Sequence, residues 1–253
     1  MKKRYGQHFI SDRNLLQRIV DLAHIAPNDT VIEIGPGTGT LTRELAGAAS
    51  RVIAVEIDRD LIGALRRKMP GNVEIVEGDA LEVRLDALTD GPYHIVGNLP
   101  FNIATILLQK FIAHRARIIE VTVMLQREVA ERVRATPGTR DWGPLSILIQ
   151  YYALATWGFI VPPGAFTPPP KVDSAVIRLD WNPGVADFPA FTNFVHRAFS
   201  SRRKKLLNNL LQIASSKSRG EIADILQSSG IPVDARAETL SIEDFLRVYN
   251  RIQ

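Results

Sequence analysis

The stretch Thr30-Val-Ile-Glu-Ile-Gly-Pro-Gly-Thr-Gly-Thr-Leu41 decides the fold, because it passes from a β-rich run through closely spaced glycines toward a helix. Residues 30–34 predict a short buried strand, and residues 41–46 predict the helix that follows it. The same alternation repeats along the chain, with strands predicted at 51–57, 73–76, 94–97 and 120–125 and helices at 13–25, 60–68, 105–114 and 127–134. Alternating strands and amphipathic helices predict an α/β fold, in which helices cover both faces of a mostly parallel sheet.

The C-terminal part of the chain follows a different pattern. A strand predicted at 172–179 leads into the turn signal Trp181-Asn-Pro-Gly184, and residues 187–253 then predict only short helices. We therefore expect a sheet-containing domain at 1–183 and a small all-α domain at 184–253. The longest apolar stretch, 145–161, is interrupted by polar residues and is short of the ~20 residues that span a bilayer. We interpret it as a buried helix that runs into a strand, in a cytoplasmic protein with no membrane association.

The composition excludes several kinds of site. The chain has no cysteine, which rules out disulfides, iron–sulfur clusters and thiol nucleophiles, and its five histidines lack any metal-ligand spacing, so we expect no metal site. The formal net charge is +4 and the sequence pI is about 9.5. Positive charge gathers at residues 2–4 and at Arg202-Arg203-Lys204-Lys205. Such blocks favour polyanions such as nucleic acid, although a solvated helix face or a frayed terminus would also explain them.

The glycine loop is a candidate cofactor site, because ligands of such sheets bind at the carboxyl ends of the strands. Gly35, Gly37 and Gly39 have a G-x-G-x-G spacing, which differs from the G-x-G-x-x-G dinucleotide fingerprint. The carboxylate of Glu33 just before the first glycine is typical of S-adenosylmethionine (SAM) sites. A cationic sulfonium ligand is compatible with that carboxylate.

Two further carboxylates end neighbouring strands. Glu56 ends the second predicted strand, where a carboxylate can bind ribose hydroxyls. Asp79 follows the third, where a carboxylate can accept a hydrogen bond from an adenine amino group. The alternative for both residues is a helix N-cap after each strand.

The tetrapeptide Asn98-Leu99-Pro100-Phe101 follows the strand predicted at 94–97. The Asn98 side-chain oxygen and the Leu99 carbonyl can both accept from an exocyclic amine. Pro100 stiffens the turn, and Phe101 offers a flat face on which a base could stack. The alternative is a proline turn after a buried strand, with Phe101 in the core, and the tetrapeptide alone does not separate the two.

With these motifs in place, the chain resembles the rRNA adenine N6,N6-dimethyltransferases over nearly its whole length, and specifically their bacterial small-subunit branch. Besides the glycine loop and the tetrapeptide, the resemblance rests on Gln7-His-Phe-Ile-Ser-Asp12, Glu56-Ile-Asp58, Gly78-Asp-Ala-Leu81 and Ala165-Phe-Thr-Pro-Pro-Pro-Lys-Val-Asp-Ser174. The last of these is the most specific.

The resemblance implies a Rossmann-like methyltransferase sheet, a SAM cofactor and a monomeric enzyme. Cofactor contacts would fall on His8, Ile10, Gly35, Glu56, Asp79 and Asn98. The implied substrate is a pair of adjacent adenosines in a hairpin loop near the 3′ end of 16S rRNA, in an immature 30S subunit, each methylated twice. The basic residues 202–205 would contribute RNA contacts.

The target adenine must leave its stack, and we expect Phe101 and Phe166 to sandwich it. The alternative for Phe166 is packing beneath the proline-rich loop. The chain departs from the family at two positions. His8 stands where Asn is usual, and Phe101 stands where Tyr is most frequent, so stacking is kept and a hydroxyl is lost.

Three other functions compete with this one. A ribosome-assembly factor, whose binding to the immature subunit matters more than its catalysis, would carry the same motifs. The nearest competing enzyme is an Erm-type methyltransferase of large-subunit rRNA, and the 166–174 tract and the C-terminal segment favour the small-subunit enzyme. An NAD-dependent dehydrogenase is disfavoured by the glycine spacing and by the 98–101 turn.

Overall fold

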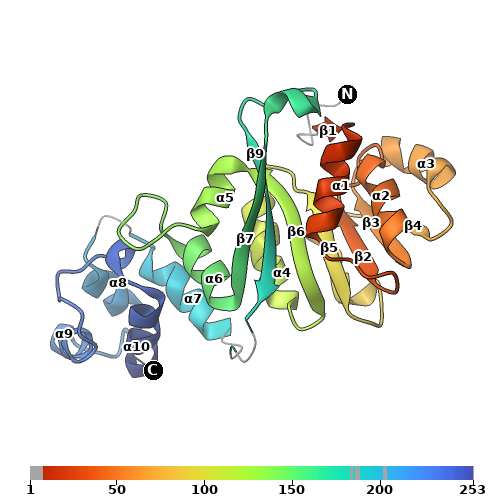
Figure 1. The fold of residues 1–253 in the computed structure, drawn as a ribbon. Coiled ribbons are helices and arrows are strands. Elements are labelled where there is room, and N and C mark those ends of the chain that lie inside the picture. The colour runs from red at the N-terminus through yellow and green to blue at the C-terminus, as the bar shows by residue number, and fades with distance from the viewer. Residues whose placement is uncertain (1–7, 183–184, 186–188, 202–203, 253) are drawn as a thin grey trace. The chain divides into compact units, whose positions relative to one another are not determined.

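A seven-stranded sheet with the strand order β4-β3-β2-β5-β6-β9-β7 forms the centre of the sheet-containing unit (Figure 1). The computed structural model describes residues 8–182, 185, 189–201 and 204–252. The parallel strands are β2 (Thr30–Ile34), β3 (Arg51–Glu56), β4 (Val73–Glu77), β5 (Tyr93–Asn98) and β6 (Ile118–Gln126). Strand β9 (Ser174–Trp181) pairs antiparallel with both β6 and β7 (Ala153–Val161). The α/β fold with a mostly parallel sheet is therefore confirmed.

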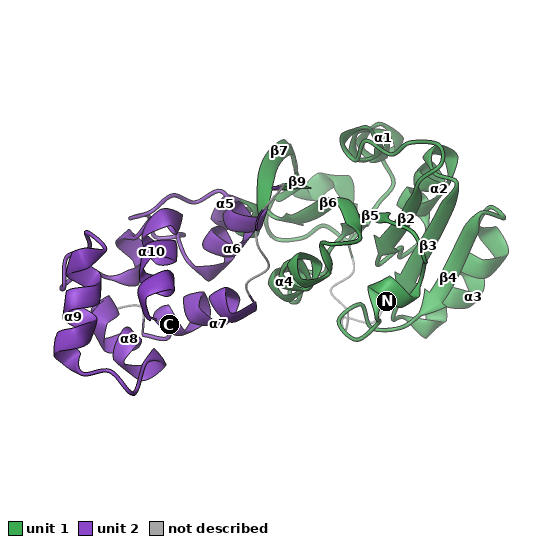
Figure 2. Cartoon of the chain, turned by 90° about the horizontal axis from the view of Figure 1, so that it is seen from below, with its two compact units in different colours: residues 1–130, 153–181 green, residues 131–152, 182–253 purple. Residues whose placement is uncertain are grey.

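Helices cover both faces of this sheet (Figure 2). Helices α1 (Arg13–Leu22) and α2 (Thr40–Ala48) bury apolar side chains together with Val31, Val52 and Val96 of the strands. Helix α3 (Arg59–Lys68) packs on Ala54 and Ile75 of the same face. Helix α4 (Ala104–His114) packs against β6 from the opposite face. The alternation of side chains along each strand supplies both apolar faces.

The start of the described chain, residues 8–10, is tied to a distant loop. Strand β1 (Phe9–Ile10) pairs antiparallel with β8 (Phe166–Thr167) in a separate two-stranded sheet. The Thr40 hydroxyl at the start of α2 also donates to the Ile10 carbonyl at 2.8 Å. The segment before α1 therefore lies between the glycine loop and the proline-rich tract.

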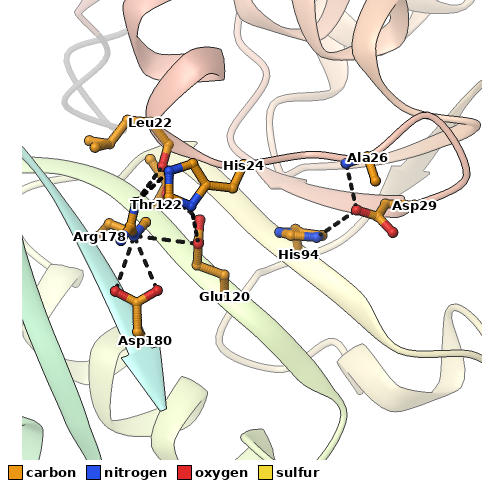
Figure 3. Close-up of polar contacts among 9 residues, drawn as sticks. All are labelled: Leu22, His24, Ala26, Asp29, His94, Glu120, Thr122, Arg178 and Asp180. Atoms are coloured by element: carbon orange, nitrogen blue, oxygen red, sulfur yellow. Dashed lines mark hydrogen bonds and ion pairs between the residues drawn. The ribbon is translucent and has the colours of Figure 1, made fainter.

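A polar cluster joins the end of α1 to β6 and β9 (Figure 3). The Arg178 guanidinium lies 3.1 Å from the Asp180 carboxylate, 3.4 Å from that of Glu120 and 2.8 Å from the His24 ring. Burial raises the pKa of the Glu120 carboxyl to about 7, while the charge of Arg178 opposes that rise. The cluster lies near the beginning of β6, away from the carboxyl ends of the parallel strands, so its role is to hold the fold.

The chain divides into two compact units that are each built from two segments (Figure 2). The sheet-containing unit comprises residues 1–130 and 153–181, and the helical unit comprises residues 131–152 and 182–253. The predicted boundary near residue 183 lies close to the last of the three divisions, between residues 181 and 182. Residues 131–152, which we expected in the first domain, group instead with the helical unit.

Helix α6 (Pro144–Tyr152) explains this assignment. Its Tyr151 ring lies 5.0 Å from the Phe191 ring of α7 (Pro189–Ala198). In the same segment, the buried Trp142 donates its indole N–H to the Leu240 carbonyl at 2.9 Å. The remaining elements here are α5 (Arg127–Val133), which begins in the other unit, α8 (Leu206–Ile213), α9 (Arg219–Ser228) and α10 (Ile242–Ile252). No helix in the described ranges combines the length and apolar character that a membrane span requires.

Candidate active site

A cavity of about 200 Å³ lies at the carboxyl ends of β2, β3, β4 and β5. It brings together most of the residues predicted from sequence, namely His8, Ile10, Glu33, Gly35, Gly37, Glu56, Asp79, Asn98, Leu99, Pro100 and Phe101. Phe166, Lys204 and Lys205 are not part of its lining. Neighbouring parallel strands end at one edge of the sheet, which is why motifs far apart in sequence meet there.

The Glu33 carboxyl is buried in the cavity wall without a complete set of partners. The residue is 1% exposed, and its Oε2 atom has no hydrogen-bond partner among the described residues. Burial raises the pKa of this carboxyl to about 8. A buried acceptor without a partner is unfavourable unless a ligand completes it. The residue therefore fits a ligand that brings a positive charge or a donor.

The Glu56 carboxylate shapes the glycine loop. Its Oε2 atom accepts from the Gly37 N–H at 3.0 Å, and its Oε1 atom accepts from the Asp58 N–H at 2.8 Å. Gly37 has φ +58°, and a Cβ atom there would lie 2.6 Å from the Phe9 ring. Only glycine fits this position. Each carboxylate oxygen keeps a further lone pair, which is available to a ribose hydroxyl.

Asp79 makes a local turn contact and also lines the cavity. One carboxylate oxygen, Oδ1, accepts from the Leu81 N–H at 2.8 Å. No helix begins after Asp79, because residues 78–84 form only turns and bends, so the helix N-cap alternative is wrong for this residue. The second oxygen is left for a ligand, and the residue lines the cavity.

The Asn98 amide is held in one orientation. Its Nδ2 group donates to the His8 carbonyl at 3.0 Å, so the Oδ1 atom remains as the acceptor. The next residue, Leu99, is buried and donates its backbone N–H to the Met124 carbonyl at 3.0 Å. The turn closes where the Ile103 N–H donates to the Pro100 carbonyl. These contacts fix the position of two acceptors for an amine.

The His8 ring lies against both aromatic residues that were expected to hold a base. It stacks on Phe101 with ring centroids 5.5 Å apart and meets Phe166 edge-on at 6.3 Å. Its Nδ1–H donates to the Pro168 carbonyl at 2.7 Å. Phe166 is 4% exposed and packs in the apolar core with Ile10 and residues of α1. A base that entered between Phe101 and Phe166 would have to replace the His8 ring.

The predicted RNA-binding block is only partly described. Lys204 and Lys205 are exposed just before α8. Arg202 and Arg203 lie outside the described residues. Within the described ranges, no group of three or more His, Asp or Glu side chains is arranged to hold a metal ion.

Several residues of the cavity were not predicted. Phe9, Thr40 and Ile57 also line it. Ile57 follows Glu56 directly at the end of a predicted strand, and this position is a signal that sequence analysis could have used. In the structure the residue is 40% exposed. Phe9 carries no such signal, because its place depends on the pairing of β1 with β8.

Comparisons with known proteins agree along the whole chain. The family model for ribosomal RNA adenine dimethylase matches residues 1–253. Ribosomal RNA small subunit methyltransferase A of Alcanivorax borkumensis is 43% identical over 98% of this chain and 89% of its own length. The protein of the same name from Moorella thermoacetica is 40% identical over 100% of this chain and 92% of its own length.

Solved structures give the same result. A dimethyladenosine transferase from Plasmodium falciparum has a TM-score of 0.81 at 27% identity, covering 97% of this chain and 98% of its own. The 23S rRNA methyltransferase ErmE has a TM-score of 0.72 at 29% identity, and the match covers 96% of this chain and 99% of ErmE. The similarity therefore includes residues of both units.

Proposed function

Because the chain belongs to the ribosomal RNA adenine dimethylase family, we propose that it uses SAM to dimethylate N6 of two adjacent adenosines in the 3′-terminal hairpin loop of 16S rRNA. Membership of the family confirms the resemblance seen in the sequence. The Asn98 amide carries the chemical part of the proposal, because its nitrogen is engaged by the His8 carbonyl and its oxygen is left as an acceptor. An immature 30S subunit as the substrate and a monomeric enzyme are further parts of the proposal.

The cavity fits a cofactor that is cationic at one end and carries an adenosine at the other. Glu33 would face the positive charge, Glu56 the ribose hydroxyls and Asp79 the adenine amino group. Ile10 and the backbone at Gly35 and Gly37 would complete the contacts. When bound, SAM supplies an electrophilic methyl group.

The chain's own part in the reaction is to orient the amine. The lone pair of adenine N6 is delocalised into the ring, which makes the amine a poor nucleophile. Two acceptors, Asn98 Oδ1 and the Leu99 carbonyl, would hold the –NH2 group and favour a pyramidal nitrogen. Orientation of this kind contributes up to ~7–11 kcal/mol in favourable cases. The methylated nitrogen then loses a proton to water without a dedicated base.

Phe101 would provide one face for the flipped adenine. A base–aromatic stack is worth roughly 1–3 kcal/mol, which is similar to the cost of unstacking a base in a loop. Because the His8 ring now lies on Phe101, we propose that it moves aside as the adenine enters. Phe166 would then form the second face.

The competing enzyme is one that acts on large-subunit rRNA. The relatives named as small-subunit enzymes are 43% and 40% identical to this chain, whereas ErmE is 29% identical. This difference favours the 16S substrate. The assembly-factor role shares the same binding surface and is separated from catalysis by the experiment below.

The proposal is tested by mapping methylated adenosines after incubation of the chain and SAM with small and large subunits that lack the modification. We expect N6,N6-dimethyladenosine at the two adjacent positions of the 16S hairpin loop. Asn98→Ala should lower turnover by at least about a hundredfold, because a misplaced nucleophile costs about that factor. The binding of this variant to the small subunit should be unchanged.

Each other outcome has a distinct meaning. Modification of 23S rRNA would contradict the 16S substrate. Near-normal turnover by Asn98→Ala would contradict the amine-holding role. If Asn98→Ala still supports subunit maturation in cells, the binding role is the one that matters for assembly.

A further inference from the structure

The connection from β4 to β5 lacks the helix that alternates with strands elsewhere in the sheet. Residues 78–92 contain only a short 3-10 turn, Leu85–Ala87, so many of their carbonyl groups need partners from outside the segment. Cationic side chains within α4 and just beyond its end provide some of them. Arg117 donates to the carbonyls of Asp86, Thr89 and Gly91 near the β5 end of the connection.

Lys110 of α4 binds the other end of the connection, next to the cavity. Its ammonium group donates to the carbonyls of Ala80, Leu81 and Val83 at 2.8, 2.9 and 2.6 Å. An ammonium group has three N–H donors, so all of them are used by this one segment. The side chain is therefore committed to the loop and does not reach a ligand.

Asp79 lies at the start of the segment that Lys110 holds. Its side chain accepts from the Leu81 N–H, and its carbonyl accepts from the Glu82 and Val83 N–H groups at 2.9 and 2.8 Å. Leu81 and Val83 therefore each donate a backbone N–H to Asp79 and accept from Lys110 through their carbonyls. Any movement of the loop away from Lys110 would also move the Asp79 carboxylate in the cavity wall.

We propose that Lys110 is a positioning residue for cofactor recognition, which sets the Asp79 carboxylate toward the adenine by binding the carbonyls of the Asp79 loop. This inference rests on the proposed cofactor site. Helix α4 begins just after the turn that would hold the substrate amine, so Lys110 also ties the adenine side of the cavity to that turn. Burial lowers the pKa of the Lys110 ammonium, and the nearby charge of Asp79 opposes that change.

The test compares two ligands that differ only at the group that Asp79 would bind. They are S-adenosylhomocysteine and its analogue without the 6-amino group, and their dissociation constants are measured by calorimetry with the full chain. The unmodified chain should prefer the first by about tenfold or more, the range expected for a hydrogen bond to an ionised acceptor. Asp79→Asn should reduce the preference to below about threefold.

Lys110→Met removes the three donors while keeping a long apolar stem. We expect it to reduce the preference as Asp79→Asn does, and to leave the affinity for the 6-deamino analogue within about twofold. General damage to the cavity would weaken both ligands equally. Lys110→Gln, which removes the charge but keeps an amide donor, gives a second measurement if the Met variant is poorly folded.

Arg117→Met is the matched control, because it removes three hydrogen bonds to the same connection far from Asp79. This variant should have lower thermal stability, but it should keep the full preference for S-adenosylhomocysteine over the 6-deamino analogue. A preference that survives in both Lys110 variants and is lost in Asp79→Asn would overturn the role of Lys110 alone. If the unmodified chain shows no preference, the assignment of Asp79 to adenine fails, and the inference fails with it, while the methylation map still tests the function separately.

Discussion

Glu33 shows how a single buried carboxyl responds to its surroundings. At neutral pH a carboxyl with a pKa of about 8 is mostly protonated, so the folded chain holds a neutral acid in the cavity wall. The unfolded chain would ionise the same group at about pH 4.5. The folded state therefore binds one more proton between these two values, and the free energy of unfolding falls as the pH rises through that window.

We predict that Glu33→Gln removes this dependence on pH. The contribution of Glu33 to the free energy of unfolding is fully present below about pH 4.5 and is lost by about pH 8. Between these values the free energy of unfolding falls by up to about 1.4 kcal/mol per pH unit. Glu33→Gln should therefore gain stability relative to the unmodified chain as the pH rises from 5 to 8, as measured by urea denaturation without cofactor. Glu82→Gln, at an exposed position, is the control, and a difference that does not change with pH would contradict the prediction.

At the scale of elements, the glycine loop and β1 depend on one another through Gly37. An added Cβ would meet the Phe9 ring at 2.6 Å, and the residue has a left-handed backbone conformation. We predict that Gly37→Ala lowers stability by at least about 1 kcal/mol, because both strain and a clash oppose it. It should also weaken cofactor binding, as shown by calorimetry with S-adenosylhomocysteine.

Gly47 provides the matched control for this substitution. It lies inside α2, and an added Cβ there would meet no atom within 4 Å. Gly47→Ala should raise stability by roughly 0.5–1 kcal/mol, because alanine favours a helix over glycine. Equal effects of the two substitutions would show that the contact with Phe9 does not matter.

The parallel strands and their polar ends could be predicted from the sequence because their signals are local. Glu33, Glu56 and Asp79 each follow a short apolar run, and the rule that ligands bind at strand ends brought them to one site. The pairing of Phe9 with Thr167 could not be predicted, because strands of two residues have no periodicity. Lys110 looked like an ordinary lysine on an amphipathic helix, since the carbonyls it binds belong to a segment without regular structure.

At the scale of the whole molecule, net charge and its placement govern the interaction with RNA. RNA binding that neutralises phosphates weakens as the salt concentration rises. The logarithm of the binding constant falls linearly with the logarithm of the salt concentration, with a slope of about 0.7–0.9 per phosphate contact. We predict that Lys204→Gln combined with Lys205→Gln lowers the slope of log K against log salt by up to about 2 for small-subunit RNA. The same loss of charge at Arg67 and Lys68 of α3 should leave the slope unchanged. An unchanged slope in the Lys204 and Lys205 variant would remove these lysines from the interface.

The assignment of residues 131–152 to the helical unit was beyond the reach of sequence analysis. A boundary is signalled by turns and by changes of pattern, and the return at Trp181-Asn-Pro-Gly184 has both. The earlier crossing has neither, because α5 continues the alternation of strands and helices across residues 130 and 131. Only packing, such as that of Tyr151 on Phe191, reveals it.

This interrupted arrangement has a consequence for synthesis on the ribosome. Strands β7 and β9 complete the sheet only after residue 181 has been made, and α6 emerges before its partner α7 exists. At about 5–20 residues per second, the apolar side chains of α6 wait for several seconds before α7 can cover them. The nascent chain is therefore vulnerable to aggregation in this interval. A chaperone that binds emerging polypeptides would find its target in residues 144–152, although in the finished protein this helix is well covered.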